Sequence, residues 1–513
     1  MIKLLFTKIF ITLYQFFFKS TYTKFLSDLE SPEKVQDQTL EDILELYNAS
    51  PIAENLKLRN YEDFRTLPIS DYADIEEDLK DHRLFPREVK TFEKTSGSSG
   101  KNKLIPYSKE LLKSFQKLFI IWTMDILSHI KFEKLTFYFS ISPQFKELNS
   151  KAENEYETLE SDKDYLGPLL SNIGSPFFVE VPFIRELKDP YEFKLLLSLY
   201  LISRRDLEII SIWSPSFLTE LCHFIKENES TLIKLLNKGE YKEKWKFKTL
   251  SLERLTLQTS FPSLKFISSW GSVNAREQFK ELEELFPNVT IQRKGLLATE
   301  APITLPLFSA KGFLPILSEV FFEFLNEEGN ILRLHQLEVG GVYEIIISQK
   351  GGLYRYRIKD QIIVTHFYKS TPCFDFYGRR DALSDLVGEK LHERDIQDSF
   401  KDTSAKVAIP SLKGKCYYIL SSKDLEIKEK EKIQIRLEEN YHYQNSIKLG
   451  QLKSLQFLTI KDCQEKISIF YQEVRKINKG DQKLSQLLYR ESDDELINYL
   501  LGLDQDESSN RFK

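Results

Sequence analysis

The sequence predicts an α/β protein with a large N-terminal domain of mixed and parallel sheets and a small α+β domain at the C-terminus. The chain has 513 residues, which is more than one hydrophobic core usually organises. A strand at Phe266-Ile267, an amphipathic helix over 275–285 and a strand over 289–292 form a βαβ unit, which implies a parallel sheet. After residue 381, short strands and helices alternate on a scale too small to continue that sheet.

The remaining elements follow from periodicity and turn residues. A long helix is expected from Ser108 to Ile130, because its apolar residues recur on one face and Ser108 is a suitable N-cap. Strands over 343–348 and 353–358 flank Gln349-Lys350-Gly351-Gly352, which predicts a hairpin, and a third strand is expected over 362–367.

The C-terminal part shows a pattern of its own. Strands are expected over 417–420 and 455–460, and helices over 428–440 and 463–477. We therefore place one domain at residues 1–378 and a second at 379–513.

Composition narrows the class of protein. Hydrophobic residues make up 41% and charged residues 29%, as in globular domains, and the net charge of −5 gives no general attraction to nucleic acid. The four cysteines lie far apart and show no C-x-x-C spacing, which is typical of a reducing cytosol. We expect a cytoplasmic protein and assign these cysteines to no metal site or Cys/His pair.

The first 18 residues are strongly apolar. Their uninterrupted core over 9–18 is about half the length of a membrane crossing, and no A-x-A-like cleavage site follows. A buried or amphipathic helix is the preferred interpretation. The alternative is peripheral membrane contact through Phe10, Phe16, Phe17 and Phe18.

Residues 95–103 read Thr-Ser-Gly-Ser-Ser-Gly-Lys-Asn-Lys. Glycines let backbone N–H groups crowd around an anion, while the serines add hydroxyl donors and the lysines add positive charge. The spacing does not match a Walker phosphate loop or a dinucleotide fingerprint. A flexible linker is the alternative, but the helix expected from Ser108 follows closely. The segment therefore indicates a loop for the phosphates of ATP.

Three further signals lie downstream of this loop. Thr299-Glu300 follows the second strand of the βαβ unit, at the end where open α/β sheets bind ligands. Asp360 ends the run Tyr-Arg-Tyr-Arg-Ile-Lys-Asp, and Arg379 lies in Gly378-Arg379-Arg380-Asp381 at the expected domain junction.

Together these motifs resemble the nucleotide site of the adenylate-forming superfamily, and most of all the auxin-responsive promoter family of acyl-acid amido synthetases, in particular its bacterial members. The resemblance covers most of the chain. Its most specific parts are Gly-Leu-Tyr-Arg-Tyr-Arg at 352–357 and Ser-Asp-Leu-Val-Gly-Glu-Lys at 384–390. It implies that ATP and a carboxylic acid form an acyl-adenylate, whose acyl group an amine, commonly an amino acid, then takes as an amide. It also implies a small C-terminal domain that rotates between the two steps.

The resemblance implies roles for individual residues. Thr299 would lie against the α-phosphate, and Glu300 would ligate Mg²⁺. Asp360 would accept hydrogen bonds from the ribose, and Arg379 would contact the ribose or the α-phosphate. Lys390 would stabilise charge during adenylation. The phosphates would be held by the loop residues Ser96, Gly97, Ser98, Ser99, Gly100 and Lys103.

Each role has a structural alternative. In these alternatives, Glu300 is an N-cap or a surface acid, and Asp360 is a turn residue. Arg379 then belongs to an ion pair, and Lys390 is a solvated side chain. Tyr354 and Tyr356 are expected to pack in the sheet rather than stack on adenine. Trp270 fits the acyl pocket and the core equally well.

One residue departs from the pattern of the resembling family, and one absence bears on the branch of the superfamily. Lys359 precedes Asp360 where that family usually has glycine, so the turn that carries Asp360 is expected to differ. No lysine near the C-terminus occupies the setting that acyl-CoA ligases use, which favours an amine acceptor over a thiol. Transfer to CoA or a carrier thiol, and a nucleotide-binding homologue without turnover, remain the alternatives.

Overall fold

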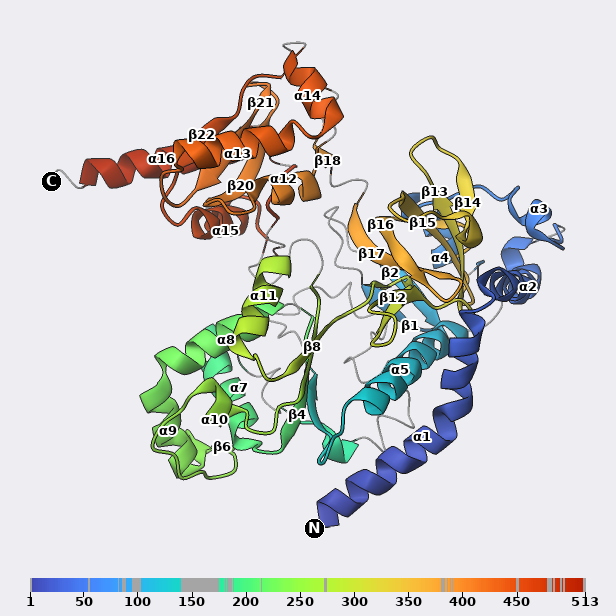
Figure 1. Cartoon of the computed structure of the whole chain (residues 1–513), viewed down its shortest axis with the longest axis horizontal. Coiled ribbons are helices and arrows are strands. Elements are labelled where there is room, and N and C mark those ends of the chain that lie inside the picture. The colour runs from blue at the N-terminus through green and yellow to red at the C-terminus, as the bar shows by residue number, and fades with distance from the viewer. Residues whose placement is uncertain are drawn as a thin grey trace. The chain divides into compact units, whose positions relative to one another are not determined.

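The computed structural model describes residues 2–53, 56–81, 83–84, 89–94, 103–139, 175–179, 181, 187, 189–213, 215–271, 275–379, 383–384, 386–387, 389, 391–448, 452–477, 482, 485–489, 491 and 494–510. The chain divides into two compact units. Unit 1 comprises Met1–Ile358 and Ile362–Asp375, and unit 2 comprises Lys359–Gln361 and Phe376–Lys513. Figure 1 shows the elements of both units, coloured along the chain.

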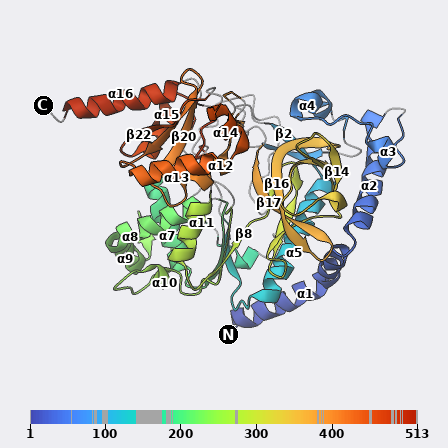
Figure 2. The same cartoon turned by 45° about the horizontal axis from the view of Figure 1, so that its top comes forward.

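Unit 1 begins with two long helices that lie side by side (Figures 1 and 2). They are α1 (Ile2–Asp28) and α5 (Lys109–His129). The Ser108 hydroxyl accepts the N–H of Leu111, so the predicted helix and its N-cap are confirmed. Strands β1 (Val89–Lys94) and β2 (Leu104–Ser108) pair antiparallel immediately before α5. The shorter helical elements of this part are α2 (Pro32–Ala49), η1 (Pro51–Ala53), α3 (Tyr61–Phe64) and α4 (Tyr72–Lys80).

A four-stranded parallel sheet forms the second part of unit 1. Its order is β3-β4-β7-β8, with β3 at Thr136–Phe139, β4 at Leu207–Ser211, β7 at Phe266–Ser269 and β8 at Thr290–Arg293. Helix α11 (Arg276–Leu285) connects β7 to β8, which confirms the predicted βαβ unit. The other elements here are η3 (Ser175–Phe177), α7 (Pro190–Ser203), α8 (Pro215–Glu227), α9 (Glu229–Lys238), β5 (Glu240–Tyr241), β6 (Trp245–Lys246) and α10 (Leu257–Ser260).

A seven-stranded sheet follows, with the order β11-β12-β17-β16-β15-β13-β14. The predicted hairpin turn is confirmed between β15 (Val342–Gln349) and the returning chain, where Gly352 has a φ of +111° that glycine adopts without strain. The strands predicted at 353–358 and 362–367 were wrong as separate elements, because β16 runs unbroken over Tyr356–Tyr368. Leu353 to Arg355 lie outside this strand. Arg355 has a φ of +47°, which is not the extended backbone of a strand, so the strand begins at the next residue. The remaining strands are β11 (Thr304–Leu307), β12 (Gly312–Pro315), β13 (Val320–Leu325), β14 (Ile331–Arg333) and β17 (Thr371–Arg379), and η5 spans Leu334–Gln336.

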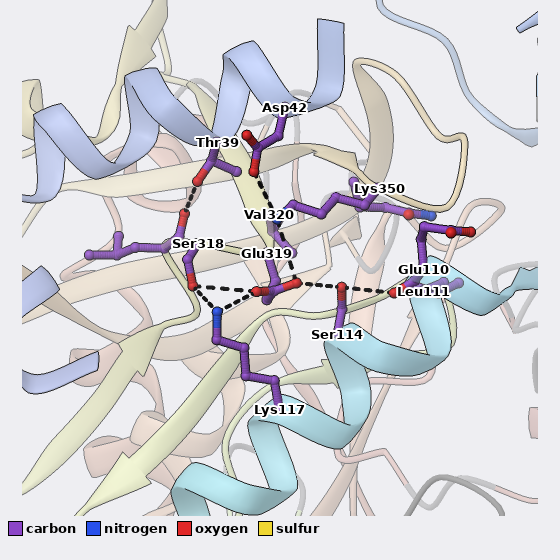
Figure 3. A network of polar contacts seen from close by, with 12 residues as sticks. Thr39, Asp42, Glu110, Leu111, Ser114, Lys117, Ser318, Glu319, Val320 and Lys350 are labelled. Carbon is purple, nitrogen blue, oxygen red and sulfur yellow. Dashed lines mark hydrogen bonds and ion pairs between the residues drawn. The ribbon is translucent and has the colours of Figure 1, made fainter. Parts of the chain in front are cut away.

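A buried carboxylate ties this sheet to the helices of unit 1 (Figure 3). Glu319 accepts a hydrogen bond of 2.8 Å from the Ser114 hydroxyl and one of 2.6 Å from the Lys117 ammonium, both on α5. Lys350 of the hairpin turn lies 3.9 Å from Glu319 and 3.1 Å from Asp42 on α2. Three segments far apart in sequence therefore share one network of charges.

Unit 2 is the compact α+β module that the sequence predicts. Its main sheet has the order β20-β21-β22, with β20 at Ala405–Ser411, β21 at Cys416–Ser421 and β22 at Gln456–Thr459. The predicted helices are confirmed as α13 (Ile427–Leu437) and α15 (Cys463–Glu473). The other elements are β18 (Leu383–Ser384), β19 (Leu391–His392), α12 (Glu393–Phe400), α14 (Tyr441–Lys448) and α16 (Glu495–Asn510).

Candidate functional site

The serine-rich loop is flanked by the paired strands β1 and β2. Lys94, the last residue of β1, is opposite Leu104, the first residue of β2. The predicted phosphate-binding residues Ser96, Gly97, Ser98, Ser99 and Gly100 lie outside the described residues, and so does Lys390. Among residues 95–103, Lys103 is the one that the structure describes.

Lys103 is half-buried next to two tyrosines. Its ammonium group lies 3.4 Å from the Tyr356 hydroxyl and 5.7 Å from the centre of the Tyr72 ring. The Tyr72 hydroxyl also accepts the N–H of Leu104 at 3.1 Å, which fixes the start of β2 beside that ring. These contacts hold the Lys103 charge against Tyr356.

Thr299 and Glu300 form the turn of a small hairpin between β9 (Leu297–Ala298) and β10 (Ala301–Pro302). They follow β8 along the chain as predicted, but in this turn rather than directly at the end of the strand. The Thr299 carbonyl accepts a 2.6 Å hydrogen bond from the hydroxyl of Tyr107 on β2. Glu300 is buried, and its carboxylate accepts a 3.4 Å hydrogen bond from the Tyr356 hydroxyl.

Tyr356 thus bridges the two charged side chains predicted for the phosphates and the metal. Its hydroxyl accepts from Lys103 and donates to Glu300, and both contacts are longer than the roughly 2.7–3.2 Å typical of such bonds. Burial is the main cause that raises the pKa of Tyr356, and the nearby Glu300 and Asp71 carboxylates add to it. The hydroxyl therefore keeps its proton throughout the neutral range.

Sequence reasoning assigned Tyr356 to packing and missed this bridge. The packing expectation holds, because the ring is fully buried, but the hydroxyl has a second role. Tyr354 is the contrasting case, since its ring packs edge-on against Tyr47 at 5.0 Å and its hydroxyl donates to the Leu84 carbonyl at 3.4 Å. The bridge depends on partners 56 and 253 positions away, so no local pattern announces it.

Asp360 and Arg379 come together within unit 2. The Arg379 guanidinium lies 3.3 Å from the Asp360 carboxylate, and both side chains are half-buried. Asp360 is on β16, and Arg379 is the last residue of β17. The carboxylate and the guanidinium, which are the two groups predicted to contact the ribose, are therefore adjacent.

The motif at 384–390 contains a buried structural carboxylate. Glu389 accepts the N–H groups of Leu386 and Val387, each at 2.8 Å, and also the hydroxyl of Tyr417. The Tyr417 hydroxyl in turn accepts from the hydroxyl of Ser384, in the same motif, at 2.6 Å. Glu389 therefore anchors the segment that precedes Lys390 to the core of unit 2.

Aromatic rings and a lysine gather at the carboxyl ends of three parallel strands of unit 1. Lys294 follows β8, lies 5.2 Å from the Trp213 ring and 5.6 Å from the Trp122 ring, and bonds the Ser211 hydroxyl at 2.7 Å. Trp270 follows β7 and donates its N–H to the carbonyl of Trp213. Ligands of open α/β sheets bind at this edge. Trp270 is among the residues predicted from the sequence, whereas Lys294 is not.

The cysteines and the histidine next to one of them do not form a nucleophile pair. Cys222 is buried on α8, whereas the neighbouring His223 points away and lies 3.0 Å from Glu281. Burial raises the pKa of the Cys222 thiol to about 12 and that of Cys373 to about 11. Among the residues that the structure describes, no group of three or more His, Cys, Asp or Glu side chains is arranged to hold a metal ion by itself.

Comparison with known proteins decides the family. The model of the GH3 family N-terminal domain matches residues 21–291, and that of the GH3 family central domain matches residues 313–379. The chain belongs to the GH3 family. The first match contains Lys103, and the second contains Tyr356, Asp360 and Arg379. The resemblance inferred from the motifs is thus confirmed.

Curated GH3 relatives match over short segments. Probable indole-3-acetic acid-amido synthetase GH3.7 of Oryza sativa subsp. japonica is 38% identical over 76 residues, which are 15% of this chain and 12% of that protein. Indole-3-acetic acid-amido synthetase GH3.4 of Arabidopsis thaliana is 36% identical over 97 residues, covering 17% of this chain and 16% of that protein. The matched segments therefore span less than a fifth of either relative.

Solved structures extend the likeness to the whole fold. The AtGH3.15 acyl acid amido synthetase in complex with 2,4-DB superposes with a TM-score of 0.74 at 18% identity, over 94% of this chain and 95% of that chain. A 2-hydroxyisobutyryl-CoA ligase in the postadenylation state gives a TM-score of 0.55 at 11% identity, over 94% of each chain. The GH3 chain thus has the adenylate-forming fold, as the sequence predicts.

Proposed function

We propose that this GH3 protein is an ATP-dependent ligase that activates a carboxylic acid as an acyl-adenylate and transfers the acyl group to the amine of an amino acid. Membership of the GH3 family supports the reaction class. Relatives carry names such as indole-3-acetic acid-amido synthetase and 4-substituted benzoates-glutamate ligase. The observation that carries the proposal is the cluster of Lys103, Tyr356 and Glu300 next to the serine-rich loop.

The first step needs positive charge where pyrophosphate leaves. The contact with the Tyr356 hydroxyl holds the Lys103 ammonium group in one direction, where it can bind phosphate oxygens. The loop residues Ser96 to Gly100 are proposed to add hydroxyl and backbone donors around the same oxygens. This arrangement lowers the barrier because it stabilises charge that develops only in the transition state.

Glu300 fits a role at Mg²⁺. Its buried carboxylate is the hard oxygen donor that this cation prefers, and one or two carboxylates suffice when nucleotide phosphates supply further oxygens. Bound there, Mg²⁺ would neutralise charge on the phosphates. Tyr356 donates to Glu300 and so holds the carboxylate in place without competing through a second charge.

Three further residues are proposed to contact the sugar and to supply positive charge during adenylation. Asp360 would accept the ribose hydroxyls, and the adjacent Arg379 would contact the ribose or the α-phosphate. We assign Lys390 to the adenylation transition state and residues 379–513 to a small mobile domain.

The acid substrate is proposed to bind at the carboxyl ends of the parallel strands. Lys294 offers a half-buried charge for the carboxylate, and Trp213 and Trp270 offer aromatic surface for the acyl part. The variant Lys294→Met should raise the KM for the acid by roughly tenfold, because a charge-assisted hydrogen bond is lost, with little change in the KM for ATP. An equal effect on both would place Lys294 elsewhere.

The reaction is tested by carboxylate-dependent exchange of pyrophosphate into ATP, screened over many acids. Amino acids and then CoA are supplied to the adenylate, and the product is identified by mass. An amide supports the proposal, and a thioester would assign the acceptor to a thiol. Tight ATP binding without exchange for any acid would identify a nucleotide-binding protein without turnover.

A further inference from the structure

Helix α1 is apolar on two sides, and unit 1 covers one of them. On the inner side, Thr7, Tyr14 and Phe25 are buried. Phe10 packs at 4.9 Å from the Phe177 ring, and the Tyr22 hydroxyl donates to Asp125 of α5 at 2.9 Å. The helix is therefore fixed along α5, as both views show (Figures 1 and 2).

The opposite side carries large apolar side chains that are exposed in the described residues, although Phe6, at its edge, also stacks on the Phe177 ring at 5.6 Å. Four of them recur at every fourth position, which places them along one stripe of a helix. These four and the neighbouring Phe6 and Phe16 are six of the nineteen large apolar side chains that are exposed in the described residues. We call this surface the α1 outer face, and it comprises Leu5 (61% exposed), Phe6 (45%), Ile9 (49%), Leu13 (49%), Phe16 (75%) and Phe17 (67%). A continuous exposed apolar surface of this kind marks an interaction site.

The charged side chains that α1 itself carries before Asp28 are all positive. From Ile2 to Ser27 the sequence holds four lysines and no acidic residue, although the whole chain has a net charge of −5. Lys3 pairs with Asp206, and Lys24 pairs with Asp28. The other two, Lys8 and Lys19, are exposed and eleven positions apart, about three helical turns, so they project from the same edge of the outer face.

We propose that the α1 outer face binds the surface of a membrane that contains anionic lipids, with the helix lying parallel to the membrane plane. The phenylalanines and leucines would enter the boundary of the acyl chains, and Lys8 and Lys19 would reach the headgroups. No helix among the described ranges combines the length and hydropathy needed to span a bilayer. A helix on the surface fits that finding.

Charge also separates this occupant from a second copy of the chain. In a two-fold pair, if one residue contacts a second residue of the other copy, the second contacts the first in return. Because Lys8 and Lys19 project from the same edge, an antiparallel pair centred between them would bring Lys8 of one copy opposite Lys19 of the other, and like charges would repel. An anionic lipid surface instead complements both lysines.

The test is sedimentation of the full chain with vesicles of phosphatidylcholine, alone or mixed with phosphatidylglycerol. We expect binding to the mixed vesicles and a roughly tenfold or larger loss in Phe16→Ser/Phe17→Ser, because two inserted rings are removed. The variant Lys8→Gln/Lys19→Gln should bind the mixed vesicles about fivefold more weakly for each lysine removed. The matched control is Ile427→Ser/Ile435→Ser, which replaces exposed apolar residues of α13 (75% and 63% exposed) and should bind as the parent chain does.

Thermal unfolding of each variant shows whether the fold is kept, which is expected because the replaced side chains are exposed. The proposal is overturned if the parent chain binds neither kind of vesicle, or if the double serine variant binds as well as the parent. A dimer in sedimentation velocity that this variant abolishes, without any lipid binding, would assign the outer face to a second copy instead.

Discussion

Arg355 and Tyr356 are neighbours in one motif, but their side chains differ in role. The Arg355 side chain stabilises the fold, whereas the Tyr356 hydroxyl contacts two residues of the candidate site. Arg355 is 3% exposed and binds the Glu323 carboxylate through two hydrogen bonds, of 2.8 and 3.0 Å, and it also donates to the carbonyls of Arg65 and Leu67. Tyr356 makes two contacts of 3.4 Å to charged side chains. The Arg355 side chain forms its hydrogen bonds with groups of the fold. The Tyr356 hydroxyl instead contacts an ammonium group and a carboxylate that can each also bind a ligand. A motif that identifies a family therefore need not be a list of its catalytic residues.

Of the variants proposed here, replacement of Arg355 should have the largest effect on stability. Replacing Arg355 by Met leaves Glu323 buried without its cation, which should cost about 3–5 kcal/mol of unfolding free energy. Urea unfolding followed by tryptophan fluorescence measures it, since all four tryptophans of the chain belong to unit 1.

The double variant Arg355→Met/Glu323→Leu should lose less than the sum of the two single variants, because no unpaired charge stays buried. If Arg355→Met keeps its stability but loses pyrophosphate exchange, Arg355 acts in the catalytic site and not in stabilising the fold.

Lys103→Ala tests the site side. Pyrophosphate exchange should fall by roughly 10²–10³, because one donor to the developing charge is lost, while stability should change by less than about 0.5 kcal/mol. Lys109→Ala, at the exposed start of α5, is the matched control and should keep full exchange. An unchanged exchange rate in Lys103→Ala would remove the phosphate role.

Tyr356→Phe separates positioning from packing, because it removes the hydroxyl and keeps the ring. Exchange should fall about threefold to tenfold, as expected for one or two modest hydrogen bonds, and a higher Mg²⁺ concentration should be needed for half-maximal rate. Tyr354→Phe is the control from the same motif and should alter neither quantity. An unaltered Mg²⁺ dependence in Tyr356→Phe would leave Tyr356 as a packing residue.

Elements that depend on local pattern were predictable, and contacts that depend on distant partners were not. The N-cap at Ser108 and the βαβ unit around α11 follow from residues within a few positions of one another. The Arg355–Glu323 pair joins residues 32 positions apart, and neither residue type indicates its partner. The break expected before Ile362 failed because Lys359-Asp360-Gln361 is polar but still extends β16. The α1 outer face was predicted only in part: Phe16 and Phe17 are exposed as the membrane-contact alternative expects, but Phe10 packs on Phe177. A helix with apolar residues on two sides does not show which side is covered.

The smallest effect concerns the backbone at Lys359. Its φ of +66° lies in the left-handed region, where a side chain costs about 1–2 kcal/mol and glycine costs nothing. Arg355 has the same kind of backbone, with a φ of +47°, but there the buried side chain outweighs the strain. Lys359→Gly should change unfolding stability by less than about 1 kcal/mol, because relieved strain is offset by the greater freedom of glycine in the unfolded chain. Lys359→Val should lose about 1–2 kcal/mol, since a β-branched residue fits this region poorly. Calorimetric unfolding of the full chain measures both variants, and a larger loss for Gly than for Val would show that the Lys359 side chain, and not its backbone, decides the stability at this position.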